Sequence, residues 1–509
     1  MNKYTLLLFG LLLSFKTLSQ QNNTEVFLVD VMTDEERKAL GKPLNISNNE
    51  GYDNQPSFLD DDTILFSSTR NGQTDIALYT ISTNTTKWIT DTPKGSEYSP
   101  LKIPGKEAVS AIRLDADGLQ RLYQYDINTG KSQELIKDLK VGYHVWYNAH
   151  IIVCTVLIEN RMDLVVANLK DGTNYIVQKN VGRSLHKVPN TDLVSYISKA
   201  NEKIEIKTIH PISGATQTIN YIWNGREDMA WLSEDTIIAG TNSILAQVKA
   251  DTTGVWGPFH TIDPLQYNNV SRIAVSPNRQ KLALVAEPPA AAIVQKQVVS
   301  YNAGDLESFI NCYSADVIVS NFPDKIWYEG HKRMREIYEG LSPTNKTYQV
   351  AVVKRIVIGS NVVDHEKVTR NGKFEQMQVA IYNVDKGAIE RMTFIFDDTK
   401  APNPETIVQK QLDAYNARDI DRFMDTYTDD ISLFNYPVEK RSQGQEEMRK
   451  VYADFFTSTP DLHCEIKNRI VIGNKVIDEE KITANGNTFS TVAIYEVEDG
   501  KISKVYFLR

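Results

Sequence analysis

The chain has 509 residues, of which 41% are hydrophobic and 24% are charged, a composition typical of folded globular domains. Its formal net charge of −9 argues against a nucleic-acid partner, because a phosphate-binding surface needs an excess of Lys and Arg. The length predicts several domains. After the first twenty residues, no window holds the roughly 18 apolar residues that a membrane-spanning helix needs.

The N-terminal segment MNKYTLLLFGLLLSFKTLSQ has the pattern of a secretory signal peptide. Lys3 supplies a positive start, Leu6 to Phe15 form an apolar core, and polar residues follow up to Gln20. We therefore predict a signal peptide at residues 1–20 and an exported protein, periplasmic or secreted, with no transmembrane segment after cleavage. An N-terminal anchor or a buried strand is the alternative interpretation.

The cysteine content argues against disulfides and metal sites. Cys154, Cys312 and Cys464 are too few for a disulfide framework, and each lies in an apolar context, so we expect buried thiols. The sequence has no CxxC motif and no His-rich cluster. We expect no metal and no cofactor.

Residues 21–288 show short β-branched runs separated by turn residues. One unit, from Pro56 to Thr90, contains a strand at Ile64 to Ser67, an Asn71-Gly72 turn and a second strand at Ile76 to Ile81. Related units begin near Ser99, His144, Ser184, Met229 and Arg272. A period of roughly 40–45 residues with four short strands per unit is typical of propeller blades. We predict an all-β propeller with six blades.

The sixth unit stops early, at Pro288-Pro289. The segments Thr24 to Val31 and Gly41 to Ser47 have the character of its missing third and fourth strands. Such N-terminal strands would close the ring and remove an open sheet edge. The run Asp60-Asp61-Asp62 lies between two strands, where a solvated turn is favoured over a calcium site.

The segments SFLDDDTILFSSTRNGQTDIALY and AVSPNRQKLALVAE resemble TolB-like, WD40-like propeller repeats. The resemblance implies a propeller fold and a periplasmic location, and a periplasmic protein partner that contacts the propeller is one hypothesis. It implies no fixed chemistry, because such propellers serve many functions. No GxSxG motif predicts an accompanying peptidase.

Beyond a short linker, one segment occurs twice. IVQKQVVSYNAGDLESF, from Ile293 to Phe309, recurs as IVQKQLDAYNARDIDRF, from Ile407 to Phe423. Further matches follow along both stretches, including RIVIG and VAIY. We therefore predict a tandem duplication, with domains at residues 289–400 and 401–509.

Each copy predicts helices followed by long alternating strands. Helix one carries Val294, Val298 and Tyr301 on one face in the first copy. Asp305 and Asp419 lie where helix two needs an N-cap. Helix two is expected to bury Leu306, Phe309, Ile310 and Tyr313. A short strand, a third helix and four strands complete an α+β cone with an internal pocket.

The repeated helical segments and the final GKISKVYFLR resemble the SnoaL-like group of the nuclear-transport-factor-2-like superfamily. That superfamily includes ketosteroid isomerases, polyketide cyclases, dehydratases, epoxide hydrolases and non-enzymatic binding modules, so fold alone does not choose a function. Its domains commonly dimerise through the sheet. The resemblance therefore implies that the two copies pair as an internal pseudo-dimer.

The resemblance allows a test for isomerase chemistry. Ketosteroid isomerases of this fold use a Tyr donor on helix one, an Asp base after helix two and a protonated Asp on a strand. These positions fall on Gln297 and Gln411, and on Asn321 and Asn435 or the adjacent Phe322 and Tyr436. The strand position falls in the segments Val379-Ala-Ile-Tyr382 and Val492-Ala-Ile-Tyr495. None is a carboxylate, so that chemistry is not expected in either copy.

Another set of carboxylates recurs in both copies. Asp364 and Glu366 alternate on one strand face, and Asp478 and Glu480 do the same in the second copy. If they face the cone, a carboxyl with a raised pKa could act as acid or base. The alternative is a solvated sheet face. His365 points the other way and is expected to be an ordinary surface residue.

Arginines and aromatic residues complete the expected pockets. Arg355 and Arg469 lie one strand earlier and could pair with the carboxylates. The expected pocket residues are Gln297, Asn321, Phe322, Trp327, Arg355, Tyr382, Gln411, Asn435, Tyr436, Arg469 and Tyr495.

Three functions stay open at this point. The favoured one is an exported binding or interaction protein, whose propeller contacts a partner and whose cones take a small apolar ligand or pair with each other. The alternative is a cofactor-independent isomerase, cyclase or hydrolase that acts on a small organic substrate through Asp364, Glu366, Asp478 or Glu480. The last is a non-catalytic scaffold with filled cones.

Overall fold

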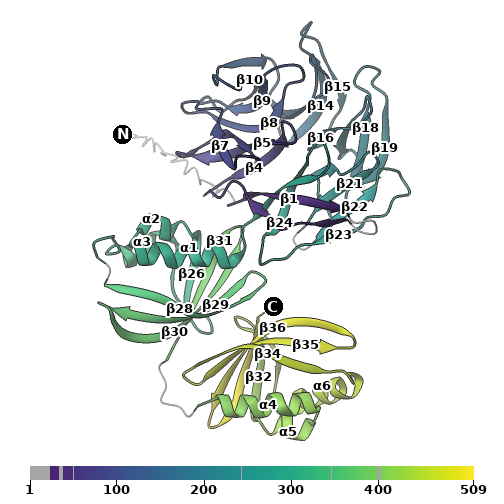
Figure 1. Ribbon diagram of the computed structural model, residues 1–509. Coiled ribbons are helices and arrows are strands. Elements are labelled where there is room, and N and C mark those ends of the chain that lie inside the picture. The colour runs from purple at the N-terminus through teal and green to yellow at the C-terminus, as the bar shows by residue number, and fades with distance from the viewer. Residues whose placement is uncertain are drawn as a thin grey trace, which may run out of the picture.

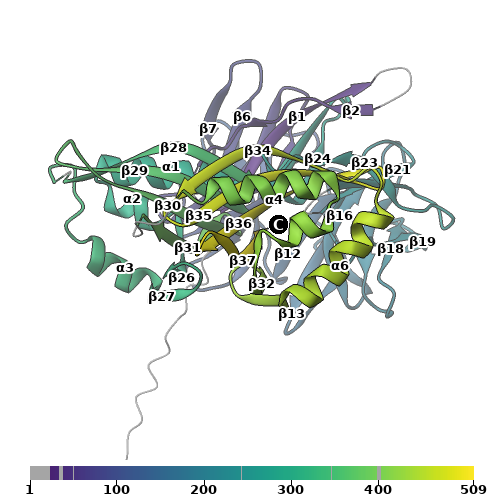
Figure 2. The same ribbon diagram turned by 90° about the horizontal axis from the view of Figure 1, so that it is seen from below.

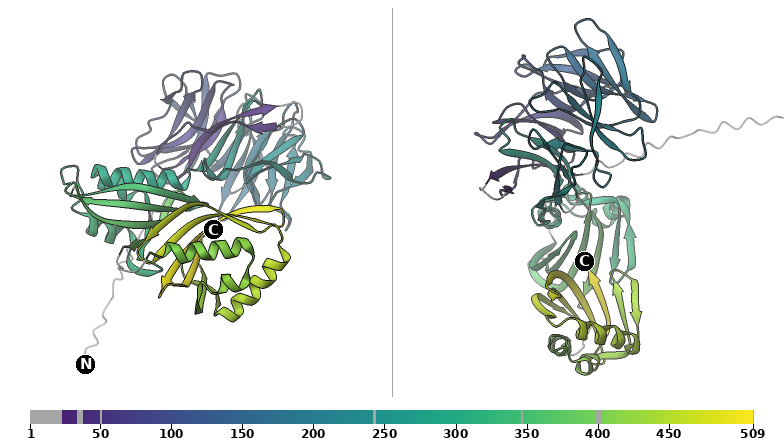
Figure 3. Two further views of the ribbon diagram at one scale, coloured as in Figure 1. Left: turned by 60° about the horizontal axis from the view of Figure 1, so that its bottom comes forward. Right: turned by 90° about the vertical axis from the view of Figure 1, so that its right-hand side faces the viewer.

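The structure is a computed structural model that describes residues 23–33, 38–49, 51–241, 244–345, 347–397 and 403–508. The predicted signal peptide at residues 1–20 lies outside these described residues. Three bodies follow one another along the chain: a β-propeller, a first α+β unit and a second α+β unit (Figure 1). The first unit lies between the propeller and the second unit, as the side view in Figure 3 shows.

In the described residues before α1, the strands form six antiparallel sheets, and in five of them the strands that follow one another in sequence are neighbours in the sheet. Five of the sheets use consecutive strands: β4 (Asp53–Phe58), β5 (Thr63–Arg70), β6 (Gln73–Thr80) and β7 (Thr85–Trp88); β8 (Ser96–Lys102), β9 (Ala108–Leu114), β10 (Gln120–Asp126) and β11 (Ser132–Ile136); β12 (Val141–Trp146), β13 (Ile151–Ile158), β14 (Arg161–Asn168) and β15 (Asn174–Gln178); β16 (Val181–Lys187), β17 (Val194–Ser198), β18 (Glu205–Ile209) and β19 (Thr216–Tyr221); β20 (Met229–Trp231), β21 (Thr236–Gly240), β22 (Ile244–Lys249) and β23 (Gly257–Thr261).

The remaining sheet joins the two ends of the propeller. Its strands are β24 (Asn268–Val275), β25 (Lys281–Glu287), β1 (Glu25–Thr33), β2 (Lys38–Leu40) and β3 (Leu44–Asn45). β1 lies antiparallel to β25, with Glu25 opposite Ala286, and it also pairs with β3. Val26 and Val29 are fully or almost fully buried, so β1 is a central strand of this sheet and not a loose edge.

Three details of the structure bear on the calcium, metal and cysteine predictions. Asp60 Oδ1 accepts hydrogen bonds from the backbone N–H groups of Asp62 at 2.9 Å and Thr63 at 2.8 Å, so the acidic run forms a tight turn. Across the described residues, no three His, Cys, Asp or Glu side chains are arranged to hold a metal ion. The three cysteines are buried thiols, as predicted.

The two α+β units have the same order of elements. The first contains α1 (Ala290–Ala303), α2 (Leu306–Ile310), β26 (Tyr313–Asn321), β27 (Lys325–Glu329), α3 (Gly330–Tyr338), β28 (Tyr348–Ile358), β29 (Asn361–Arg370), β30 (Lys373–Asp385) and β31 (Ala388–Phe396). The second contains α4 (Glu405–Ala417), α5 (Ile420–Met424), β32 (Tyr427–Asn435), β33 (Glu439–Gln443), α6 (Gln445–Ser458), β34 (His463–Ile472), β35 (Lys475–Ala484), β36 (Asn487–Glu498) and β37 (Lys501–Leu508).

Each unit has one six-stranded sheet. The strand orders are β27-β26-β31-β30-β29-β28 and β33-β32-β37-β36-β35-β34, with one parallel contact per sheet, β26 with β31 and β32 with β37. The helices cover one face of each sheet (Figure 2). A sheet face covered by helices is where a pocket forms in such a unit.

Local signals set the helix ends. Asp305 caps α2 by accepting a hydrogen bond from the Ser308 N–H at 3.0 Å, and Asp419 caps α5 in the same way. Gly304 ends α1 at φ 75°, where a Cβ would meet the Ser342 carbonyl oxygen, so this position requires glycine. The prediction that Tyr313 belongs to the second helix is wrong: α2 ends at Ile310, and Tyr313 begins β26.

The second faces of the two sheets pack against each other. One continuous apolar cluster draws on both units, and its members include Ile356, Val379, Ile381, Ile470, Val492 and Ile494. Polar contacts accompany it: the Tyr436 hydroxyl bonds to Thr393 Oγ1 at 2.6 Å, and Lys354 Nζ donates to the Arg469 carbonyl at 2.7 Å. Each sheet therefore has one face toward its helices and one toward the other unit.

Within the described residues, no helix has both the length and the apolar character needed to cross a membrane.

Candidate functional site

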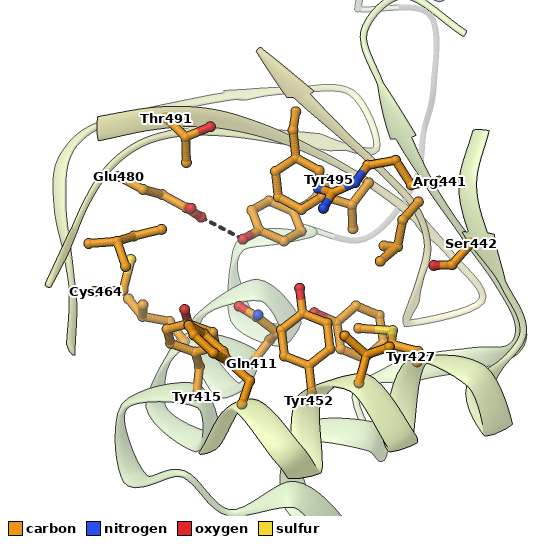
Figure 4. A pocket seen from close by; sticks show the side chains of 18 of the residues that line it. Gln411, Tyr415, Tyr427, Arg441, Ser442, Tyr452, Cys464, Glu480, Thr491 and Tyr495 are labelled. Atoms are coloured by element: carbon orange, nitrogen blue, oxygen red, sulfur yellow. Dashed lines mark hydrogen bonds between the residues drawn. The ribbon is translucent and has the colours of Figure 1, made fainter. Parts of the chain in front are cut away.

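A cavity of about 370 Å³ lies between the helices and the sheet of the second unit (Figure 4). We call it the second cavity. Its walls come from α4, α6 and strands β32 to β37. They are formed by Gln411, Leu412, Tyr415, Tyr427, Leu433, Arg441, Ser442, Glu447, Met448, Val451, Tyr452, Phe455, Cys464, Glu480, Ile482, Phe489, Thr491, Tyr495, Val505 and Phe507. This is the size and the mostly apolar, aromatic character of a site for a small organic molecule.

The alternation of β35 aims Glu480 into the second cavity. Successive side chains of a strand point to opposite faces, so Asp478, Glu480 and Ile482 share the face toward the helices. Asp478 is 1% exposed and Glu480 is 6% exposed. The interpretation of these residues as a solvated sheet face is therefore wrong, because α4 and α6 cover that face.

Glu480 is a buried carboxyl group in the wall of the second cavity. Its Oε1 accepts a hydrogen bond from the Tyr495 hydroxyl at 2.6 Å (Figure 4). Burial raises the pKa of Glu480 to about 7, and the negative charge of Asp478 adds to this, while Tyr495 and Arg469 oppose it. Near neutral pH this carboxyl can therefore either donate or accept a proton inside an apolar site.

Asp478 has a different role from Glu480. Arg469 Nε and Nη2 each donate to one oxygen of Asp478 at 2.7 Å, a bidentate pair. Arg469 Nη1 also donates to Gln409 Oε1 on α4 at 2.9 Å. Asp478 and Arg469 thus join β35, β34 and α4 outside the cavity walls, and the pair holds the sheet and helix together.

The first unit has a related cavity of about 300 Å³, which we call the first cavity. It is lined by Gln297, Val298, Tyr301, Phe309, Trp327, Tyr338, Val350, Glu366, Val368, Gln376, Gln378, Tyr382, Met392, Phe394 and Phe396. Glu366 lies in it as Glu480 does in the second, and burial likewise raises its pKa to about 7. Arg355 holds Asp364 in a bidentate pair at 2.6 Å.

The two buried glutamates differ in their hydrogen bonds. Glu366 Oε1 accepts from the Tyr382 hydroxyl at 3.0 Å, and Oε2 accepts from Gln378 Nε2 at 2.7 Å. In the second unit, Thr491 lies opposite Glu480 in the strand register, as Gln378 lies opposite Glu366. Thr491 donates instead to the Leu508 carbonyl at 2.9 Å. Among the described residues, the second oxygen of Glu480 therefore accepts no such hydrogen bond.

The structure brings together only part of the predicted pocket. Gln297, Trp327, Tyr382 and Glu366 line the first cavity, and Gln411, Tyr495 and Glu480 line the second. The four residues of the two Arg–Asp pairs lie beside the cavities. Asn321 and Asn435 lie at the ends of β26 and β32, and the Asn435 side chain donates to Glu439 across the hairpin.

Phe322 and Tyr436 lie between the units and not in the cavity walls. Their rings stack on each other with centroids 6.3 Å apart, and Phe322 also contacts Tyr506. Both pack against the apolar cluster shared by the two sheets. The prediction that Phe322 and Tyr436 line a pocket is wrong. Sequence does not distinguish the two sheet faces, because the face toward the other unit is as apolar as the face toward the pocket.

Arg441 is one of the cavity residues that the sequence patterns did not predict. It lies on the short strand β33, and its guanidinium lies over the Phe507 ring, 5.3 Å from the centroid. Comparison of the two repeated segments would have found it, because Arg441 occupies the position of Trp327 in the first unit.

Comparison with known proteins identifies the family of the second α+β unit. Residues 408–505 match the family model of the SnoaL-like domain, so the second unit is a SnoaL-like domain. The comparison with curated proteins found no match.

Several solved structures are similar to parts of the chain. An uncharacterized cystatin fold protein of Novosphingobium aromaticivorans is 31% identical over 21% of this chain and 100% of that one, with a TM-score of 0.20. An NTF2-like protein of unknown function from Cytophaga hutchinsonii is 19% identical over 22% of this chain and 93% of its own, with a TM-score of 0.19. TolB of Acinetobacter baumannii is 12% identical over 52% of this chain and 64% of its own, with a TM-score of 0.36.

Proposed function

We propose that this chain is an exported binding protein whose SnoaL-like domain takes a small, mostly apolar organic molecule. The observation that carries the proposal is the second cavity, in which aromatic side chains surround one carboxyl group, Glu480. A molecule with a single hydroxyl or carbonyl group fits this chemistry, because Glu480 can donate to it when protonated or accept from it when ionised.

The rest of the chain supports a binding role. We take the six N-terminal sheets as the blades of a TolB-like propeller, closed by β1, that contacts a periplasmic protein partner. We take the two α+β units as a tandem duplication paired as an internal pseudo-dimer. The shared apolar cluster between their sheets supports this pairing, since it buries both faces at once.

Acid–base catalysis on the bound molecule is the second candidate function. The observation that favours it is the contact of Glu480 with Tyr495 inside the cavity, together with a pKa of about 7 that suits proton transfer. Deuterium exchange at the carbon beside the carbonyl of a bound cyclic ketone, followed by NMR, tests it. Catalysis predicts faster exchange with the wild-type chain than with Glu480→Gln, and equal rates would exclude it.

A fluorescence titration with the neutral apolar dye phenylnaphthylamine tests the binding function. Two matched substitutions fill one cavity each: Ile482→Trp in the second and Val368→Trp in the first, since both residues line the respective cavities from the same sheet position. In the chain with Val368→Trp, where only the second cavity is open, we expect dye binding to persist, and adding Ile482→Trp should weaken it by about tenfold or more.

Circular dichroism spectra check that each variant is folded, and Ile482→Phe replaces Ile482→Trp if the larger side chain prevents folding. Dye binding that is absent from the wild-type chain, or unchanged in the folded Ile482 variants, would overturn the proposed function.

A further inference from the structure

We propose that the second cavity selects organic anions, with the charged group of the ligand on Arg441 and its apolar body among the aromatic side chains. This inference rests on the proposed function and names the class of ligand for the same cavity. Three observations carry it: the position of Arg441, its lack of a competing ion pair, and the contrast with the first cavity.

Arg441 is placed to meet a ligand. It lines the second cavity from β33, beside Ser442, and Figure 4 shows its side chain reaching over the cavity. Its guanidinium lies over the Phe507 ring, which is also a wall of the cavity. Cation–π contact fixes the plane of the guanidinium and leaves its N–H groups available to an oxyanion.

Arg441 is available for binding. Within the part of the chain that the structure describes, no carboxylate lies within ion-pair distance of its guanidinium. Glu447 also lines the cavity, but its Oε2 accepts a hydrogen bond from the Gln443 backbone N–H at 3.2 Å, next to the start of α6. A bidentate pair with a carboxylate is the interaction that an arginine in this situation makes best.

The first cavity lacks this cation. The hairpins β26–β27 and β32–β33 have the same register, with Ile326 opposite Ser320 and Lys440 opposite Phe434. Trp327 follows Ile326 as Arg441 follows Lys440. Trp327 is 56% exposed, and its ring centroid lies 6.4 Å from that of Phe394, so the first cavity has an apolar entrance.

The ligand class follows from these positions. An organic monoanion with a flat apolar body would place its charge on Arg441, and a hydroxyl or carbonyl group elsewhere on the molecule would reach Glu480 or Tyr495. A neutral molecule of the same shape would lose the charged contact and keep the apolar ones. The two cavities are thus expected to differ in ligand charge.

Two dyes of the same skeleton test this difference. Anilinonaphthalene sulfonate carries an anionic group that its neutral parent phenylnaphthylamine lacks. Titrations use the full chain with Val368→Trp, so that only the second cavity is open. We expect the sulfonate to bind more tightly than the neutral dye, and Arg441→Gln to lower the ratio of the two affinities by about fivefold to tenfold.

Matched variants separate a local effect from a change in net charge. Arg449→Gln removes a positive charge from α6 outside the cavity, where Arg449 pairs with Asp421 at 2.7 Å, and is expected to leave the ratio unchanged. Arg441→Lys should retain part of the preference, because it keeps the charge and loses the bidentate geometry. Arg441→Trp should give the second cavity the neutral preference expected of the first.

The outcomes separate the two proposals. If neither dye binds the second cavity, the proposed function fails and this inference with it. If the neutral dye binds but the ratio is the same in the parent chain, in Arg441→Gln and in Arg449→Gln, the inference alone is overturned. A ratio that falls equally with Arg441→Gln and Arg449→Gln would also overturn it, because general electrostatics would then explain the preference.

Discussion

At the scale of single residues, burial decides what the carboxylates of the SnoaL-like domain can do. Asp478 and Glu480 lie two positions apart on β35 and face the same way, yet Asp478 is held by Arg469 while Glu480 has only the Tyr495 hydroxyl on one oxygen. Other ionisable groups near Glu480 are Tyr415, Tyr427 and Cys464. Because burial raises its pKa to about 7, the Glu480 carboxyl responds to pH in the neutral range.

The raised pKa of Glu480 has a consequence for stability. Glu480 has a pKa of about 7 in the folded chain and the ordinary 4.5 in the unfolded chain. The stability that protonation of Glu480 gives is therefore fully present below pH 4.5 and is lost as the pH rises to about 7. The loss amounts to about 3 kcal/mol for this group. Glu480→Gln should remove that part of the pH dependence.

Urea unfolding at pH 5 and pH 8, followed by circular dichroism, measures this effect. The wild-type chain should lose more stability between the two pH values than Glu480→Gln does, and the exposed Glu446→Gln should behave as wild type. An equal loss in Glu480→Gln and wild type would contradict the assigned burial of Glu480.

At the scale of elements, β1 connects the two ends of the propeller. The Val31 N–H donates to the Gln280 carbonyl at 2.8 Å, and Val29, two residues earlier, faces the same neighbour and lies opposite Leu282. A central strand cannot lose such a donor without opening the sheet between β1 and β25.

Val29→Pro should therefore destabilise the propeller by about 3 kcal/mol or more, because proline removes the N–H donor of a central strand. Limited proteolysis should then cut the chain within β24 and β25 much faster than in wild type. Val29→Ala keeps the donor and loses only two methyl groups, so it should stay closer to wild type. Equal protection of the two variants would mean that β1 does not close this sheet.

Sequence patterns predicted which segments form strands better than they predicted whether a strand face turns toward a pocket, toward solvent or toward the other unit. A strand at Thr24 to Val31 was expected where β1 runs from Glu25 to Thr33, and alternation placed Asp364 with Glu366 and Asp478 with Glu480 on common faces. The side to which each face turns depends on packing between segments far apart in sequence. For this reason the sequence leaves two alternatives for the carboxylates, a face toward the cone or a solvated sheet face. For the same reason Phe322 and Tyr436 were wrongly predicted to line a pocket.

At the scale of the whole molecule, the contact between the two sheets fixes the α+β units to each other. Tyr436 is central to it, since its hydroxyl bonds to Thr393 and its ring stacks on Phe322. Tyr436→Ala should weaken the interaction between the two units by about 3–5 kcal/mol.

Scanning calorimetry detects this loss as a separation of the unfolding transitions of the two units, which should unfold together in the wild-type chain. The matched control is Tyr348→Ala, because Tyr348 is 40% exposed on β28. Coincident transitions in Tyr436→Ala would show that the contact does not couple the units.

A crystal structure of the full chain grown with phenylnaphthylamine tests the central claim most directly, because it locates the ligand. The account predicts dye density in the second cavity, between Tyr452 on α6 and Tyr495 on β36, with the dye amine close to Glu480. A second cavity filled by its own side chains, with dye only on the propeller or at the contact between the units, would contradict it.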